Sequence, residues 1–173
     1  YAESAGCRRV ALLAHFGEGF PTATCGACDN CLEPRETYDG TVVAQKFLSC
    51  LYRIARHSGF SVGLRHVVAV LTGADNEKIR RWGHDQLSTY GIGRHLSEAL
   101  WRAVLRQLVA QGHVVTEVEL PTLLLTESAR AVLRGEVLLT MKQPREQLKL
   151  AERNARPTRR SSSTRPVTPL DPV

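Results

Sequence analysis

The most regular hydrophobic pattern in the chain lies between residues 39 and 59. Apolar side chains recur there at intervals of three and four residues, which is the spacing of one helix face. They are Val43, Phe47, Cys50, Leu51 and Ile54. We predict a helix that begins near Asp39 or Thr41, ends at Gly59 and buries this stripe, with Cys50 as a small core residue.

Two further segments show helical spacing. The segment "LRHVVAVLTG" predicts a helix that ends at Gly73, and "SEALWRAVLRQLVAQG" predicts a longer one, capped by Ser97 and ended by Gly112. The face of the longer helix that we expect to be buried carries Trp101, Val104, Leu105 and Leu108. The stretch between these helices, residues 74–96, is polar and punctuated by glycine, which predicts only short helical turns.

After Gly112 the pattern becomes typical of β-strands. The runs "HVVTEVE" and "TLLLTE" flank Leu120 and Pro121, which predicts a tight hairpin, and Thr126 is then expected to cap a short helix. Three helices followed by a two-stranded hairpin is the order of a winged helix, a helix-turn-helix variant whose third helix usually meets the DNA major groove. The predicted fold class is therefore mainly α with a small β-hairpin.

Four cysteines gather near the N-terminus. Cys25, Cys28 and Cys31 form two overlapping Cys-x-x-Cys steps, and Cys7 lies upstream on an expected helix whose apolar stripe includes Val10, Leu13 and Ala14. Four thiolates suffice for a closed tetrahedral zinc site, and Gly26 in the first gap favours a left-handed turn around the ion. We predict a structural zinc ion that joins a helix to a loop, and hence a helical zinc-binding subdomain with four cysteine ligands that precedes the winged helix.

Other uses of these cysteines are a disulfide pair, an iron–sulfur cluster or a catalytic zinc ion. Adjacent Cys-x-x-Cys steps favour a metal over structural disulfides in a chain with cytosolic character. Nothing else in the sequence suggests electron transfer. A catalytic zinc ion needs an open coordination position that four thiolates do not leave. His15 is not counted as a ligand.

Composition and charge define the rest of the organisation. The chain has 173 residues, 43% of them apolar, and a net charge of +6, and the part from Lys142 onward holds eight Lys or Arg against three Asp or Glu. We expect a zinc-binding subdomain at 1–36, a winged-helix domain at 37–142, and a basic linker or tail rich in Pro, Ser and Arg at 143–173. Without a membrane-spanning stretch or a signal peptide, a cytoplasmic, nucleoid-associated location is expected.

Several stretches together resemble the C-terminal region, called RQC, of bacterial RecQ-family helicases. They are "CRRVALLAHFGE", "CGACDNCL", "YDGT", "GHDQLSTYGIGR" and "LTESARAVLRGE". The resemblance implies an ATP-dependent DNA helicase that moves 3′ to 5′, in which Cys7, Cys25, Cys28 and Cys31 match the zinc ligands. It also implies that the winged helix binds duplex DNA at the fork, and that ATP and Mg²⁺ belong to a motor upstream of this chain. No nucleotide-binding or hydrolase motif appears in the chain itself, so no enzyme activity of its own is expected.

Candidate DNA contacts surround the start of the third long helix. Arg94 and His95 precede it, while Arg102 and Arg106 follow at i, i+4 spacing on its polar face, where they could grip phosphates. The alternative is a solvated face on which Glu98 pairs with Arg102. His84 in "GHDQLSTYG" is a further candidate, although a packed turn is the stronger interpretation for it.

Trp82 and Tyr90 could stack on an unpaired base or belong to the core. The wing has no aromatic residue at its tip, which argues against a strand-splitting role. No set of side chains on the third helix addresses base edges, so sequence-independent binding is expected.

Two rival functions remain open. The family resemblance also implies a docking site for the acidic C-terminal tail of single-stranded DNA-binding protein, at Arg53 and Arg134, although both could be ordinary surface arginines. The second rival is a stand-alone, zinc-containing transcription regulator of the winged-helix class. Such a regulator would need sequence-specific readout and usually a dimer.

Overall fold

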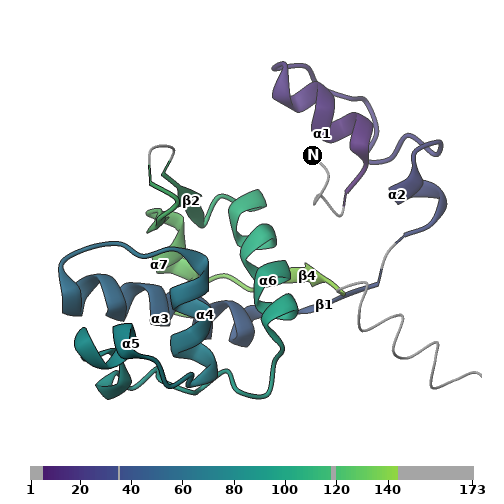
Figure 1. The fold of residues 1–173 in the computed structure, drawn as a ribbon. Coiled ribbons are helices and arrows are strands. Elements are labelled where there is room, and N and C mark those ends of the chain that lie inside the picture. The colour runs from purple at the N-terminus through teal and green to yellow at the C-terminus, as the bar shows by residue number, and fades with distance from the viewer. Residues whose placement is uncertain (1–5, 35, 118–119, 144–173) are drawn as a thin grey trace, which may run out of the picture.

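The computed structural model describes residues 6–34, 36–117 and 120–143. Its helices are α1 (Arg8–His15), α2 (Asp29–Leu32), α3 (Thr41–Ser58), α4 (Leu64–Thr72), α5 (Glu77–Arg81), the 3-10 turn η1 (His84–Gln86), α6 (Glu98–Ala110) and α7 (Ser128–Leu133). Its strands are β1 (Thr37–Asp39), β2 (Val114–Thr116), β3 (Leu123–Leu125) and β4 (Thr140–Lys142). In Figure 1, α1 and α2 lie together, apart from the body formed by α3 to α7. The predicted fold class is confirmed.

The body is a three-helix core closed by a hairpin. Helix α3 packs against both α4 and α6, and the hairpin strands β2 and β3 contact α6 and α3 (Figure 1). The predicted apolar stripes of these helices are buried where the helices meet. The largest fully buried side chains of the body include Phe47, Leu51, Ile54, Trp101 and Leu108. This arrangement is the winged helix that the element order predicted.

The predicted helix boundaries are confirmed at the residues that end or cap them. Gly59 and Gly73 follow α3 and α4 in the left-handed conformation, with φ of 74° and 69°, which residues with a Cβ rarely adopt. At the start of α6, the Ser97 hydroxyl accepts a hydrogen bond from the Leu100 amide at 3.3 Å. Between α4 and α6 there are only short helical turns, as expected.

The strands of the hairpin are shorter than the sequence suggested. Strands β2 and β3 are antiparallel, with Thr116 opposite Leu123. The Glu117 amide then donates to the Thr122 carbonyl at 3.0 Å, which is the last pairing that the structure describes before the predicted turn at Leu120 and Pro121. Thr126 also differs from its expected role: its hydroxyl donates to the Gly112 carbonyl at 2.7 Å and so ties α7 to the end of α6 instead of capping α7.

A second strand pair closes the body and was not predicted. Strand β1 pairs antiparallel with β4, with Tyr38 opposite Met141. The Gln107 side chain on α6 forms both hydrogen bonds that a paired strand would offer to Lys142 of β4. It accepts from the Lys142 amide at 2.6 Å and donates to the Lys142 carbonyl at 3.2 Å. The Thr41 hydroxyl accepts from the Leu139 amide at 2.8 Å. The start and the end of the winged helix are thus fastened together.

The stripe predicted for α1 is present but is not buried. Helix α1 contains no fully buried residue, and Cys7 lies immediately before the helix, at its N-cap, rather than within it. Among the described residues, no helix is long and apolar enough to cross a membrane. The predicted tail lies, apart from Gln143, outside the described residues.

Candidate metal centre and nucleic-acid interface

The four predicted cysteines converge on one point. The Sγ atoms of Cys7, Cys25, Cys28 and Cys31 all lie within 4.8 Å of one another, and those of Cys28 and Cys31 are 3.4 Å apart. Sulfur atoms around a tetrahedral zinc ion, each about 2.3 Å from the metal, are separated by about 3.8 Å. The cluster therefore has the size and the donor set of a zinc centre.

Local backbone structure positions the thiol groups of these cysteines. Cys7 precedes α1, Cys28 is the N-cap of α2, and Cys31 lies within α2, where its amide donates to the Cys28 carbonyl at 2.9 Å. Gly26 adopts a φ of 64°, as the sequence predicted, and turns the chain between Cys25 and Cys28.

Backbone amides make two of these thiols acidic. The Val10 amide donates to the Cys7 thiolate and outweighs desolvation, so the pKa of Cys7 falls to about 6. The Arg8 amide similarly lowers the pKa of Cys28. The pKa of Cys31 rises to about 11, because its thiol hydrogen bonds with Cys28. The lowered pKa values of Cys7 and Cys28 favour the thiolate, the form that binds metal.

Polar contacts around the cysteines hold the two halves of the centre together. The Arg8 guanidinium forms two parallel hydrogen bonds with the Asp29 carboxylate, at 2.5 and 2.7 Å, and so joins α1 to α2. The buried Asn30 side chain donates to the Gly6 carbonyl at 2.8 Å. Our sequence reasoning did not identify these residues, although each lies beside a ligand in the sequence.

These residues fit a closed zinc site. Four thiolates from two chain segments complete a tetrahedron, and the ion would supply structural cross-linking. Inside the centre, hydrogen bonds from backbone amides orient the sulfur atoms, and the pair between Arg8 and Asp29 fixes the spacing of the two segments.

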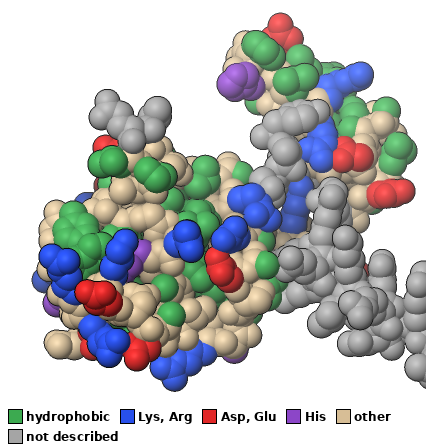
Figure 2. All heavy atoms as spheres, in the orientation of Figure 1, with side chains coloured by type: hydrophobic (Ala, Val, Ile, Leu, Met, Phe, Trp, Pro, Cys, Tyr) green, Lys and Arg blue, Asp and Glu red, His purple; other side chains and the backbone are tan. Residues whose placement is uncertain are grey.

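The candidate DNA contacts on α6 lie on its exposed face. Arg102 and Arg106 are exposed one turn apart, while the other face of the helix buries Trp101 and Leu108. Arg102 pairs with Glu98 at 2.5 Å, which is the alternative that the sequence raised. Figure 2 shows Lys and Arg side chains in a row over α4, α5 and α6, with fewer acidic ones between them.

Arg94 and His95 are exposed just before α6. The Arg94 guanidinium lies against Gly73 and Gly91, where an added Cβ would come within 3.0 Å of it, and its Cζ is 6.0 Å from the centre of the Tyr90 ring. The Tyr90 hydroxyl donates to the Gly73 carbonyl at 3.1 Å. Tyr90 therefore supports Arg94 rather than offering a free ring.

His84 lies beneath the surface. Its side chain is completely buried and hydrogen bonds with the Ser58 hydroxyl at 2.5 Å and with His66 Nε2 at 2.7 Å. A side chain without exposed surface does not reach DNA in this conformation, so the suggested DNA contact at His84 does not fit the structure. The packed-turn alternative does fit it.

Arg53 and Arg134, the candidate partner contacts, are both exposed near one hollow. This hollow of about 590 Å³ is lined by Ser49, Tyr52, Arg53, Arg56, His57, Leu87 and Leu133. Arg134 follows Leu133 at the end of α7 and pairs with Glu136 at 3.7 Å. Arg56, which the sequence analysis did not single out, is the second basic residue in the hollow.

Two known domain families match this chain. Residues 34–150 match the RQC domain, and residues 1–32 match the RecQ zinc-binding domain. The second match covers the cysteine centre, and the first covers the winged helix.

Curated relatives carry the name ATP-dependent DNA helicase RecQ. The protein from Haemophilus influenzae is 46% identical over 148 residues, which are 84% of this chain and 23% of the relative. The Pasteurella multocida protein is 45% identical over 84% of the chain and 22% of its own length. The Bacillus subtilis protein is 33% identical over 83% of the chain and 24% of its own length. The chain thus spans about a quarter of the length of these relatives.

Proposed function

The chain belongs to the RecQ helicase family through its zinc-binding and RQC domains, and we propose that it is the family's accessory DNA-binding module. In this proposal the zinc centre has a structural role, and the winged helix binds duplex and forked DNA without reading its sequence. The parent protein is a 3′ to 5′ helicase that acts in repair, recombination and replication. ATP and Mg²⁺ serve a motor in another part of that protein.

The exposed basic residues at the start of α6 carry this proposal. Arg102 and Arg106 project from the third long helix of the winged helix, and Arg94 and His95 lie at its N-terminus. Phosphates are attracted by arginine and by helix N-termini, and such contacts carry no sequence information. The ion pair between Arg102 and Glu98 is exposed and worth little, so a phosphate can replace Glu98 as the partner of Arg102.

Salt-dependent DNA binding tests the proposal. We would measure the fluorescence anisotropy of a forked duplex and of a scrambled-sequence fork, titrated with the zinc-loaded chain. Both forks should bind equally well, and log affinity should fall linearly with log salt concentration. The Arg102→Ala variant should weaken both by about three- to tenfold and reduce the salt slope by about one.

The Arg130→Ala variant is the matched control. Arg130 also forms an exposed ion pair within its own helix, with Glu127 at 3.0 Å, but it lies on α7. Its substitution should leave DNA affinity unchanged. A flat salt response, or an equal loss in both variants, would contradict a phosphate grip on α6.

A second candidate function is docking of the acidic C-terminal tail of single-stranded DNA-binding protein. The hollow beside Arg53 favours it, because Arg53 and Arg56 could bind a terminal carboxylate while Tyr52 and Leu133 pack against an apolar side chain. An acidic peptide ending in Phe should bind to the chain, and Arg53→Ala should weaken it about tenfold. Binding that survives Arg53→Ala would remove this candidate.

Membership in a helicase family argues against the stand-alone regulator.

We place the protein in the cytoplasm beside the nucleoid, where its proposed DNA partners lie. DNA is a polyanion, and the basic row over α4, α5 and α6 complements it.

A further inference from the structure

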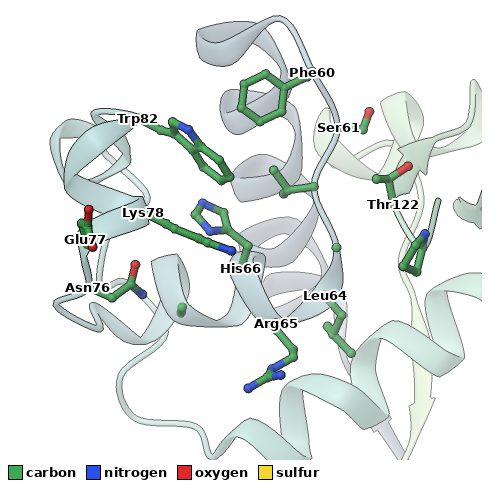
Figure 3. Close-up of a pocket in the computed structure, with 14 residues that line it drawn as sticks. Phe60, Ser61, Leu64, Arg65, His66, Asn76, Glu77, Lys78, Trp82 and Thr122 are labelled. Carbon is green, nitrogen blue, oxygen red and sulfur yellow. The ribbon is translucent and has the colours of Figure 1, made fainter.

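A second hollow lies between the start of α4, the region of α5 and the hairpin tip (Figure 3). Its volume is about 1010 Å³, at the upper end of the roughly 300 to 1,000 Å³ typical of ligand pockets. Its lining residues include Phe60, Arg65, His66, Asn76, Lys78 and Trp82. None of them is among the DNA contacts proposed on α6.

One wall of the hollow is aromatic. The rings of Phe60 and Trp82 meet edge to face with their centroids 5.2 Å apart, and His66 lies 5.0 Å from Trp82. Phe60 remains 43% exposed, although it contacts Trp82, which packs against the hydrophobic core. An aromatic cluster that stays open to solvent offers a surface on which a planar ring can stack.

The hollow also carries two cationic side chains. Arg65 and Lys78 are exposed, and within the part of the chain that the structure describes neither forms an ion pair. Arg102 differs from them, because Glu98 already neutralises part of its charge. Glu77 is the acidic residue among the lining residues, and it lies beside Lys78 on α5. The two cations are therefore available to a phosphate group.

Polar groups complete the rim. Asn76 uses its side-chain oxygen to cap α5 by accepting from the Ile79 amide at 3.0 Å, which leaves the amide NH₂ group as a donor. The Trp82 indole N–H forms no hydrogen bond to any residue that the structure describes. Stacking surfaces, cations and free donors are the three features that a nucleotide requires.

The hollow continues the basic face of α6. Arg65 lies in the first turn of α4, and α4 packs against α6, which carries Arg102 and Arg106. Figure 2 shows the row of Lys and Arg side chains over these helices and over α5. A duplex held on α6 would thus have an aromatic pocket beside it.

We propose that this hollow binds an unpaired nucleotide of single-stranded DNA, whose base stacks on the exposed face of Phe60 and meets the Trp82 ring edge to face, while its phosphates contact Arg65 and Lys78. The inference rests on the proposed function, because the duplex on α6 brings the single strand to the pocket. The wing would frame the pocket with Pro121 and Thr122 instead of inserting an aromatic wedge between base pairs.

Three DNA probes test the pocket in the zinc-loaded chain: a blunt duplex, the same duplex with a single-stranded 3′ arm, and the arm oligonucleotide alone. Stacking on a base is worth enough that Phe60→Ala should weaken binding of the arm-bearing duplex by about 5- to 100-fold. Binding of the blunt duplex should change by less than about twofold. Phe16→Ala, which removes another exposed Phe ring that follows α1 and does not line the hollow, should leave all three affinities unchanged.

Tryptophan fluorescence gives a second readout. The chain has two tryptophans, and Trp101 is completely buried in the core, so quenching by the arm oligonucleotide should come from Trp82. The Trp82→Phe variant keeps a stacking ring, and should retain arm binding while losing the quenching. Lys78→Ala should weaken arm binding and reduce its salt dependence.

The outcomes separate this proposal from the DNA-binding function. If Arg102→Ala weakens the blunt duplex but Phe60→Ala leaves the arm unaffected, the pocket proposal is wrong and the winged helix still binds DNA. Equal losses on duplex and arm would also overturn it, as would an acidic peptide that occupies the hollow in place of the arm. If no probe binds at all, both proposals fall.

Discussion

The zinc-binding segment and the winged helix, which we call the two halves of the described chain, are stabilised by different interactions. The segment from Gly6 to Leu32 contains a helix, α1, with no buried residue, while Phe16 and Leu32 are 71% and 67% exposed. The winged helix buries a continuous apolar core that runs from Ala44 to Met141. A segment of this length cannot bury enough apolar surface to offset its conformational entropy, so the cysteine centre takes the place of a core.

Because of this difference, polar contacts have different roles in the two halves. In the N-terminal half, the contact between Arg8 and Asp29 positions the ligands of a metal. In the winged helix, the Gln107 amide extends a strand pair that apolar packing already holds in place. The two halves should therefore unfold separately, one by loss of the metal and the other by loss of packing.

The largest expected effect is the loss of a zinc ligand. The substitution Cys28→Ser should release zinc and unfold the N-terminal half, because structural zinc sites contribute about 10 to 16 kcal/mol of binding free energy to folding. The winged helix should retain its own melting transition. Elemental analysis for zinc and differential scanning calorimetry measure the two effects in one sample.

Cys50→Ala is the matched control for that substitution. Cys50 is completely buried on α3, and burial raises the pKa of its thiol to about 12, which is the environment of a core residue and not of a ligand. The variant should keep its zinc and lower only the transition of the winged helix. Full zinc content in Cys28→Ser, with an unchanged melting curve, would refute the ligand assignment.

The next largest effect belongs to the core of the winged helix. Leu51 is 1% exposed on α3, so Leu51→Ala should reduce the free energy of unfolding by about 2 to 5 kcal/mol. Zinc content should stay the same. Leu138→Ala removes the same atoms from a side chain that is 76% exposed and should change stability by less than about 0.5 kcal/mol. Urea denaturation followed by tryptophan fluorescence measures both, because Trp82 and Trp101 both lie in the winged helix, and zinc loss in Leu51→Ala would mean that the halves are coupled.

The sequence predicted the features that depend on interactions between residues close together along the chain. The 3.6-residue period fixes α3, α4 and α6, and Gly59, Gly73 and Ser97 set three of their ends, because periodicity and capping act over a few residues. The cysteine spacing predicts the metal centre for the same reason. Strands β1 and β4 escape such reasoning, since each has only three residues and Tyr38 and Met141 are 103 positions apart.

The placement of the residues in the proposed binding surfaces could be predicted from the sequence only in part. Helical spacing placed Arg102 and Arg106 on one face, but only the folded structure brings Phe60, Arg65 and Lys78 around one hollow from three segments. The burial of His84 is likewise tertiary, because Ser58 and His66 reach it from α3 and α4. Two features of the sequence could have pointed to this hollow. Arg65 is a charged residue in the first turn of a helix, and Phe60 is an aromatic residue just after the end of another helix.

A smaller effect should appear when the support of the metal centre is removed. Arg8→Ala deletes the contact with Asp29 and should lower zinc affinity about 10- to 100-fold, the usual effect of residues that orient metal ligands. Competition with a chromophoric chelator measures it. Arg8→Lys should recover little, because lysine cannot form the two parallel bonds.

Arg9→Ala provides the comparison for Arg8. Arg9 is the next residue, and its guanidinium lies 5.9 Å from the centre of the Phe20 ring instead of bridging the two metal-binding segments. Its loss should leave zinc affinity within about twofold of the native value. Equal weakening by the two substitutions would show that charge near the site matters, and not the bridge.

The smallest expected effect is a response of the winged helix to acid that does not involve zinc. Burial lowers the pKa of His66 from its usual 6.5 to about 4, and His84 and Lys78 nearby add to the decrease by repelling its charged form. The groups that face His66 are His84, Trp82 and Lys78, and His57 lies beyond His84. Between pH 6.5 and 4, the unfolded chain therefore binds a proton at this position that the folded chain does not.

Stability of the winged helix should consequently fall as the pH drops from about 6.5 to about 4. The full shift would be worth about 3 kcal/mol, and we expect about 1 to 2 kcal/mol because solvent screens a side chain that is only partly buried. Urea denaturation followed by tryptophan fluorescence at each pH separates this change from acid release of zinc in the other half, because Trp82 and Trp101 both lie in the winged helix. His66→Gln should reduce the dependence, with a remainder from His84 and His113, whose pKa values burial also lowers, whereas His95→Gln on the exposed surface should leave the dependence as it is. An undiminished slope in His66→Gln would place the acid response in another titrating group, and a slope that follows zinc content instead would mean that the metal stabilises both halves.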